Sequence, residues 1–120
     1  MAPALRVLIV DDDVISRQVL LHILHVRGDE AVACDGAEEA LCLLARERFD
    51  VLLTDHVMDG MCGAELVRIA HRRCPDMRCV VLSGRPEPLG IAPQVPWLQK
   101  PPSADALGRA LSGTSGIQAL

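Results

Sequence analysis

The 120-residue sequence has almost no aromatic residues: one phenylalanine, one tryptophan and no tyrosine. Its core must therefore be built from leucine, valine, isoleucine and alanine, which commonly fill a parallel sheet covered by helices. Half of the residues are apolar, so the chain has enough hydrophobic side chains to bury a core of ordinary size. This composition argues against a disordered chain and favours one folded domain.

Long apolar runs, basic clusters and paired cysteines are missing as well. No run approaches the ~20 apolar residues of a membrane helix, and no signal-peptide pattern begins the chain. The net charge of −4 comes without a basic stripe, which argues against direct binding of nucleic acid. The five cysteines include no C-x-x-C pair, so we expect reduced thiols in a cytoplasmic protein rather than disulfides or a zinc site.

Short apolar runs alternate with amphipathic segments along the chain. Strands are expected over residues 5–10, 31–34, 51–54, 79–82 and 97–99. Helices are expected over 14–26, from a cap at Asp35 to a last turn holding Arg46 and Arg48, over 64–73, and after a cap at Ser103. The alternation predicts one α/β domain over residues 1–112, with a doubly wound parallel sheet and helices on both faces. Residues 113–120 are expected to form a flexible tail.

Two segments carry more specific expectations. In the segment 14–26, helical spacing predicts a buried face widened by Leu20 and Leu24 and formed by Ile15, Val19, Ile23 and Val26. Asp13 is a candidate cap for this helix, and Gly28 is expected to end it. Four prolines crowd the stretch between Ser83 and Trp97, so any helix there is expected to be short or irregular.

Polar residues follow four of the predicted strands. Aspartates at 11–13 follow the first strand, Asp55 the third, Ser83 the fourth and Lys100 the fifth. Ligands of such sheets bind beyond the carboxyl ends of the strands. Converging carboxylates suit a magnesium ion, an aspartate can itself become an aspartyl phosphate, and a hydroxyl and an ammonium can hold phosphoryl oxygens. The set therefore predicts phosphoryl chemistry at one edge of the sheet.

The chain resembles the receiver domains of bacterial two-component response regulators and hybrid histidine kinases. The segments that match are VLIVDDD (7–13), VLLTDHVMDGMCG (51–63), VVLSG (80–84) and LQKP (98–101). The resemblance covers residues 5 to about 111 and implies a flavodoxin-like strand order 2-1-3-4-5. It implies a phosphorelay switch that takes a phosphoryl group from a histidine kinase or phosphotransfer protein. Such a domain catalyses only its own phosphorylation and dephosphorylation and is no turnover enzyme.

The resemblance also implies a role for individual residues. Asp55 matches the phosphoacceptor, and Trp97 falls where the family often has a switching aromatic. Ser83 matches the hydroxyl that the phosphoryl group attracts, and Lys100 matches the lysine that pairs with phosphoryl oxygens. The implied Mg²⁺ ligands are Asp12 directly, Asp11 through water, Asp55 and the backbone carbonyl of Val57. The implied docking face for the phosphodonor lies on the first helix, near Ile15, Ser16 and Val19.

The sequence departs from the family at several positions. Asp59 stands where the loop after the acceptor usually carries a proline, and Pro102 stands where an aromatic residue is usual. The short, proline-rich stretch before Trp97 puts the usual output face in question. In the family, the residues two beyond the acceptor and two beyond the hydroxyl influence hydrolysis. Here they are Val57 and Arg85, and because a valine cannot hydrogen-bond an attacking water, we predict slow loss of the phosphoryl group.

Three other interpretations use the same residues. A phosphatase of the haloacid-dehalogenase type would use Asp11 and Asp13, which resemble that family's nucleophile motif, but it leaves Asp55 unexplained. A flavodoxin-like cofactor binder is disfavoured because the three aspartates would repel a phosphate. A degenerate receiver that acts only as a binding module is kept open by Asp59 and by the altered stretch before Trp97.

Overall fold

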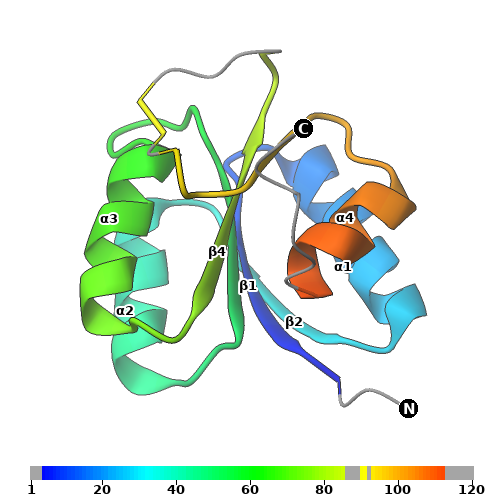
Figure 1. Ribbon diagram of the computed structural model, residues 1–120, viewed down its shortest axis with the longest axis horizontal. Coiled ribbons are helices and arrows are strands. Elements are labelled where there is room, and N and C mark those ends of the chain that lie inside the picture. Colours follow the sequence, from blue (N-terminus) through cyan, green and yellow to red (C-terminus); the bar gives the residue numbers. More distant parts are fainter. Residues whose placement is uncertain (1–3, 86–89, 92, 113–120) are drawn as a thin grey trace.

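The protein forms a five-stranded parallel sheet with helices on both faces (Figure 1). The computed structural model describes residues 4–85, 90–91 and 93–112. The strand order is β2-β1-β3-β4-β5, as predicted. The strands are β1 (Arg6–Val10), β2 (Glu30–Cys34), β3 (Val51–Asp55), β4 (Arg78–Ser83) and β5 (Trp97–Gln99). The described helices are α1 (Val14–Arg27), α2 (Ala37–Arg46), α3 (Gly63–Arg73) and α4 (Ala104–Ser112).

The core consists of two aliphatic layers, one on each face of the sheet. Figure 1 shows α2 and α3 on one side and α1 and α4 on the other. Because side chains alternate along a strand, Leu8 and Val10 pack toward α2 and α3, while Val7 and Ile9 pack toward α1 and α4. All five residues of the central strand β3 are buried. This interior matches the expectation of a core that depends on aliphatic residues.

The predicted buried face of α1 is confirmed only in part. Leu20 and Leu24 are buried, and Ile23 packs partly buried against the core, but Ile15, Val19 and Val26 are 70%, 49% and 71% exposed. The prediction was wrong for these three residues because apolar residues surround most of the helix, so spacing alone does not separate its buried from its exposed positions. Contact with the sheet decides which of them are buried.

The ends of the helices confirm most of the capping predictions. The Asp13 carboxylate accepts a hydrogen bond from the Ser16 N–H at 3.0 Å, and Gly28 ends α1 in the left-handed region with a φ of 88°. Ser103 caps α4 by accepting from the Ala106 N–H at 3.0 Å.

The predicted cap of α2 was wrong. The N-cap residue is Gly36, which makes no side-chain capping bond, rather than Asp35. Two glutamates in the first turn stabilise this helix end by opposing its positive dipole. The helix also ends at Arg46, so Arg48 lies outside it.

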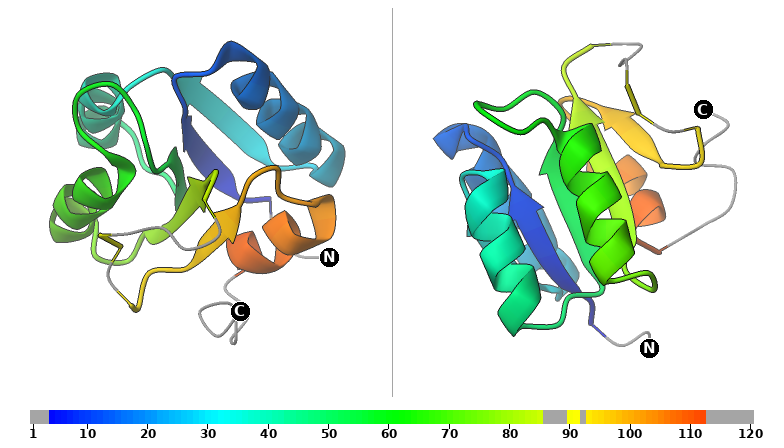
Figure 2. Two further views of the ribbon diagram at one scale, coloured as in Figure 1. Left: turned by 90° about the horizontal axis from the view of Figure 1, so that it is seen from above. Right: turned by 90° about the vertical axis from the view of Figure 1, so that its left-hand side faces the viewer.

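The connection from β4 to β5 has no helix in its described parts, 84–85, 90–91 and 93–96. This agrees with the prediction made from its prolines, although Pro86 and Pro88 lie outside the described residues, as does the predicted tail 113–120. In the right-hand view of Figure 2, α2 and α3 lie in front of the sheet and no described helix lies in front of β5. None of the described helices combines the length and apolar character needed to cross a membrane.

Candidate phosphoacceptor site

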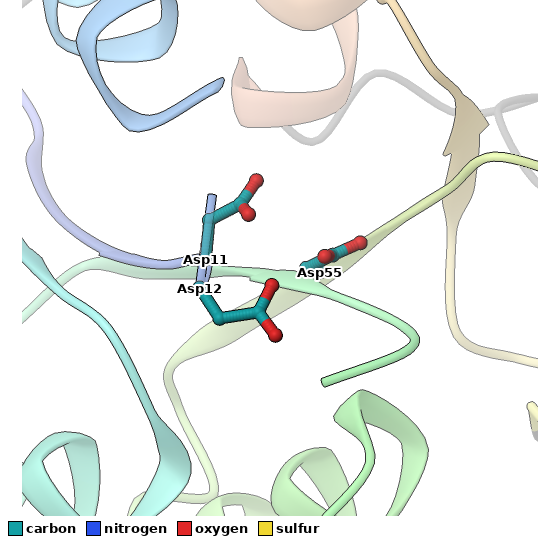
Figure 3. Close-up of side chains that lie close together, drawn as sticks. All are labelled: Asp11, Asp12 and Asp55. Atoms are coloured by element: carbon teal, nitrogen blue, oxygen red, sulfur yellow. The ribbon is translucent and has the colours of Figure 1, made fainter. Parts of the chain in front are cut away.

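Three aspartates meet at the carboxyl edge of the sheet (Figure 3). Asp11 and Asp12 directly follow β1, and Asp55 ends β3, which is paired with β1 through Val10 and Thr54. One carboxylate oxygen from each aspartate lies within 4.8 Å of those from the other two. The side chain of Asp11 is fully buried, Asp55 is 8% exposed, and Asp12 faces solvent. The strand pairing thus gathers the acidic residues that the sequence singled out.

Lys100, which directly follows the edge strand β5, brings a positive charge into this group. Its Nζ lies 2.8 Å from Asp11 Oδ2 and 3.3 Å from Asp55 Oδ1, so one ammonium bridges two carboxylates. Its backbone N–H donates to the carbonyl oxygen of Ser83 at 2.7 Å, which fixes the chain after β5 beside the end of β4. Three carboxylates with one ammonium leave a local charge of two minus, which a divalent cation would neutralise.

The two buried aspartates differ in acidity because their partners differ. Burial raises the pKa of Asp55 above its usual value, and the charge of Lys100 opposes this only in part. Burial also acts to raise the pKa of Asp11, but hydrogen bonds from Lys100, from Ser16 and from the Asp13 backbone bring that pKa below its usual value. Asp11 is therefore the firmly ionised member of the pair, and Asp55 is the carboxylate most in need of a positive partner.

The turn between β1 and α1 is held by its own side chains. The Asp13 N–H donates to Asp11 Oδ1 at 2.9 Å, and the Arg17 guanidinium donates to the Asp11 carbonyl oxygen at 2.8 Å. The Asp13 carboxylate is occupied in capping α1 and is not one of the three clustered acids. The bond from Arg17 was not predicted, because nothing in residue spacing indicates it.

Gly63 allows α3 to begin directly against the phosphoacceptor. A Cβ at this position would lie 2.2 Å from the carbonyl oxygen of Asp55, so no larger residue fits without a backbone shift. The Gly63 N–H donates to the His56 carbonyl at 2.7 Å, and the His56 N–H donates to the Leu82 carbonyl at 2.8 Å. The predicted helix began one residue later, at 64, so Gly63 was left outside it; a glycine directly before a predicted helix was a signal for such a close approach.

The loop after Asp55 carries two of the residues that the sequence singled out. The Val57 side chain is 68% exposed. The Asp59 N–H points at Asp12 Oδ2 over a long 3.4 Å contact, which the proline usual at this position could not make because proline has no N–H. Asp59 therefore adds a weak backbone donor to Asp12.

Ser83 and Trp97 lie at opposite ends of the β4–β5 pair. Ser83 is fully buried at the end of β4, and its Oγ accepts a hydrogen bond from the Arg85 N–H at 3.1 Å. It follows Leu82, which is in register with Asp55, so it borders the acidic residues. Trp97 begins β5, opposite Val81, and packs partly buried on the α2–α3 side of the sheet. A coupling between Ser83 and Trp97 stays a prediction.

Known proteins with similar sequences are signalling proteins. The chain is 39% identical over 80 residues to the response regulator protein FleR of Pseudomonas aeruginosa, covering 67% of this chain and 17% of FleR. It is 42% identical over 65 residues to the virulence sensor protein BvgS of Bordetella pertussis, covering 54% of this chain and 5% of that protein. The chain thus spans a small part of these two relatives.

Solved receiver structures share the fold over nearly the whole chain. The response regulator receiver domain protein (CheY-like) of Methanospirillum hungatei has a TM-score of 0.82 at 26% identity, covering 98% of both chains. The receiver domain of the hybrid histidine kinase CckA has a TM-score of 0.75 at 26% identity, covering 90% of this chain and 96% of that one. The family model of the response regulator receiver domain matches residues 7–91. The acidic strand ends and the 2-1-3-4-5 sheet thus agree with the sequence comparisons, and the chain belongs to the response regulator receiver domain family.

Proposed function

We propose that the chain is a phosphoacceptor switch that takes a phosphoryl group from a phosphohistidine onto Asp55 in a magnesium-dependent reaction. The observation that carries this proposal is the contact between two buried carboxylates and one lysine: Lys100 bridges Asp11 and Asp55. The carboxylates of Asp11 and Asp55 lie at the ends of the adjacent strands β1 and β3, at the edge where parallel sheets bind ligands. All five cysteines are free thiols, which suits a protein of the reducing cytoplasm.

The acidic residues fit a magnesium ion in number and in chemistry. Their donor atoms are carboxylate oxygens close enough to share one cation, and hard oxygen ligands are those that Mg²⁺ prefers. Asp12 would bind it directly, Asp11 through water, and Asp55 and the carbonyl of Val57 would complete the protein's share. The ion would offset the charge of the carboxylates and of the incoming phosphoryl oxygens.

In the transfer itself, a carboxylate oxygen of Asp55 attacks the phosphorus atom and forms a P–O bond. The P–N bond to the donor imidazole breaks, and its electron pair stays on the imidazole nitrogen, so the product is an aspartyl phosphate. Lys100, which contacts Asp55 Oδ1, can shift to a phosphoryl oxygen without leaving Asp11. The Ser83 oxygen already accepts from Arg85, so its own O–H is directed to donate to another phosphoryl oxygen.

The phosphodonor would dock on the apolar side chains exposed around the acidic residues. Ile15 and Val19 face solvent on α1, and Val57 faces solvent just beyond Asp55. An exposed apolar helix face next to a reactive group suits a helical partner that carries a histidine. Ile15→Asp should slow transfer from a histidine phosphotransfer domain. Arg17 is unsuited to this test, because its guanidinium also holds the backbone of Asp11.

The decisive experiment is labelling with acetyl phosphate, followed by intact-mass measurement. The wild type should gain one phosphoryl group with Mg²⁺ and none with a chelator, and Asp55→Asn should gain none. Asp13→Asn is the matched control, since asparagine also caps helices and Asp13 is outside the clustered acids; it should label normally.

Two other results would favour the alternative interpretations. Label that survives Asp55→Asn but disappears in Asp11→Asn would favour a phosphatase-type nucleophile at the end of β1. A folded wild type that takes up no label with Mg²⁺ would instead support a binding module without phosphoryl chemistry.

A further inference from the structure

A groove on the α2–α3 side of the sheet lies outside the acidic site. It consists of two adjoining cavities of about 230 and 190 Å³ between α3 and the segment that leads into β5. Both cavities are lined by Val67, Arg68 and Val95. We call this the α3–β5 groove. The rest of its apolar wall includes Met77, Cys79, Val81 and Pro96.

The described elements cover only part of this face of the sheet, and the groove lies where their cover ends. Parallel sheets bury both faces under helices. Here α2 and α3 cover the face over its other strands, and the described part of the chain between Ser83 and Trp97 adds no helix over β5 (Figure 2). Trp97 itself is only partly buried against the core cluster on this face. Among the described residues, the space over β5 beside α3 is open, and its apolar walls suit a helix.

The charged side chains among the described lining residues are all basic. They are Arg68, His71 and Arg78, and none of the described residues that line the two cavities is an aspartate or a glutamate, although the whole chain has a net charge of −4. The Arg78 guanidinium donates to the Ala110 carbonyl of α4, so Arg68 and His71 remain for a ligand. Arg68 is paired only loosely with Glu65, at 3.7 Å in an exposed position, and such pairs are weak.

We propose that the α3–β5 groove binds an amphipathic helix of a partner protein, with apolar side chains against Val67 and Val95 and carboxylates facing Arg68 and His71. This helix completes the layer that the described chain leaves open. Because α3 has 11 residues and rises ~1.5 Å for each, a partner helix of similar length covers the groove. The proposal concerns a surface apart from Asp55, so it does not depend on phosphorylation.

The test uses two synthetic helical peptides that carry the same leucine and alanine face. One has glutamates and the other has lysines on the polar face, and neither contains an aromatic residue. Trp97 is the protein's one tryptophan, so its fluorescence reports binding without a label. The glutamate peptide should shift Trp97 emission and bind several-fold more tightly than its lysine twin at low salt, with the difference shrinking at high salt.

Two variants locate the binding. Arg68→Glu combined with His71→Glu changes exposed residues on α3 and should reverse the preference between the peptides, while circular dichroism verifies that the variant is folded. Val95→Asp should abolish the fluorescence change, and circular dichroism verifies its fold. Equal binding of both peptides, no binding at millimolar concentration, or an unaltered preference in the double variant would overturn the proposal. A dimer of the wild type that Val95→Asp dissociates would assign the groove to a second copy instead, which also overturns it.

Discussion

The acidic site and the α3–β5 groove are two regions of one sheet, and they are built differently. At the site, Asp11 and Asp55 are buried. Lys100 bridges their two carboxylates, and the backbone N–H of Asp13 donates to Asp11. In the groove, apolar side chains face an open space, and the covering helix is absent from the described residues. The family match also ends at residue 91, within the stretch that leads to the groove.

The difference shows which part of the fold the chemistry constrains. Convergence of carboxylates requires only that β1 and β3 be adjacent and that their ends carry the right residues. The described part of the stretch before Trp97 contributes no residue to the carboxylate cluster, so the cluster does not require a regular helix there. If the two regions are independent, a substitution at the acidic site should leave the α3–β5 groove unaffected.

The largest effect is expected from Gly63→Ala, where the packing beside Asp55 leaves no room. Relief of a 2.2 Å approach to the Asp55 carbonyl requires a backbone shift, so we expect a loss of about 1–3 kcal/mol in unfolding free energy and slower labelling with acetyl phosphate. Gly108→Ala in α4 is the control, because its Cβ would meet only the flexible end of Arg27 and alanine favours a helix. Urea unfolding measures both, and equal stability of the two variants would contradict the tight contact.

Arg17→Ala should weaken the binding of Mg²⁺ at the acidic site without affecting the groove. Its guanidinium holds the Asp11 carbonyl, and loss of such an outer contact lowers metal affinity by roughly tenfold or more. Calorimetric titration of Mg²⁺ into the unphosphorylated protein measures this, and Arg17→Lys should restore part of the affinity. Arg27→Ala is the matched control, because Arg27 pairs with Asp29 at the other end of α1. If both alanine variants bind Mg²⁺ like the wild type, Arg17 does not position the acidic pair.

Asn substitutions at the two buried aspartates should change stability in opposite directions when no metal is present. Burial raises the pKa of Asp55, so its ionised form weakens the fold at pH 7, and Asp55→Asn should melt roughly 2–6 °C higher. Hydrogen bonds hold the pKa of Asp11 below its usual value, so its ionised form stabilises the fold, and Asp11→Asn should melt lower by a similar amount.

The pH dependence of these two effects follows from the direction of each pKa shift. The gain in Asp55→Asn should fade as the pH falls through the raised pKa of Asp55 toward the ordinary aspartate pKa of 3.8, because the wild-type carboxyl becomes protonated. The deficit in Asp11→Asn should fade only below 3.8, as the pH passes through its lowered pKa. Thermal melts between pH 3 and pH 8 check both, and shifts of the same sign at pH 7 would refute the assignment.

The smallest effect is expected from Val57→Asn. An amide at this exposed position can hold an attacking water near the aspartyl phosphate, so the half-life should fall by about three- to tenfold, less than a fully positioned base achieves. The decay of labelled protein after removal of the donor gives the half-life, and Val26→Asn, exposed at the far end of α1, should leave it unchanged. A wild-type half-life of only seconds with Mg²⁺ would contradict the predicted slow loss.

Much of the fold was readable from short-range patterns. The runs ending at Asp11 and Asp55 predicted β1 and β3, and the caps at Asp13 and Ser103 act within three residues of their partners. Sequence patterns failed where neighbouring residues were equally suited to the same structural role. Apolar residues surround α1, so only contact with the sheet could select Leu20 and Leu24 over Ile15 and Val19. The cap of α2 was predicted one residue early, at Asp35 instead of Gly36.

The sequence by itself determined which chemical groups this protein would hold at the ends of its strands. Carboxylates, a hydroxyl and an amine follow apolar runs, and that order is written in the chain. Only the tertiary structure decided their contacts: Lys100 reaches Asp11 across 89 positions of sequence, Arg17 reaches a backbone oxygen, and Gly63 lies against Asp55. The physical reason is that residue types and periods act locally, whereas these contacts arise only when strands from distant parts of the chain pair and bring their ends to one edge.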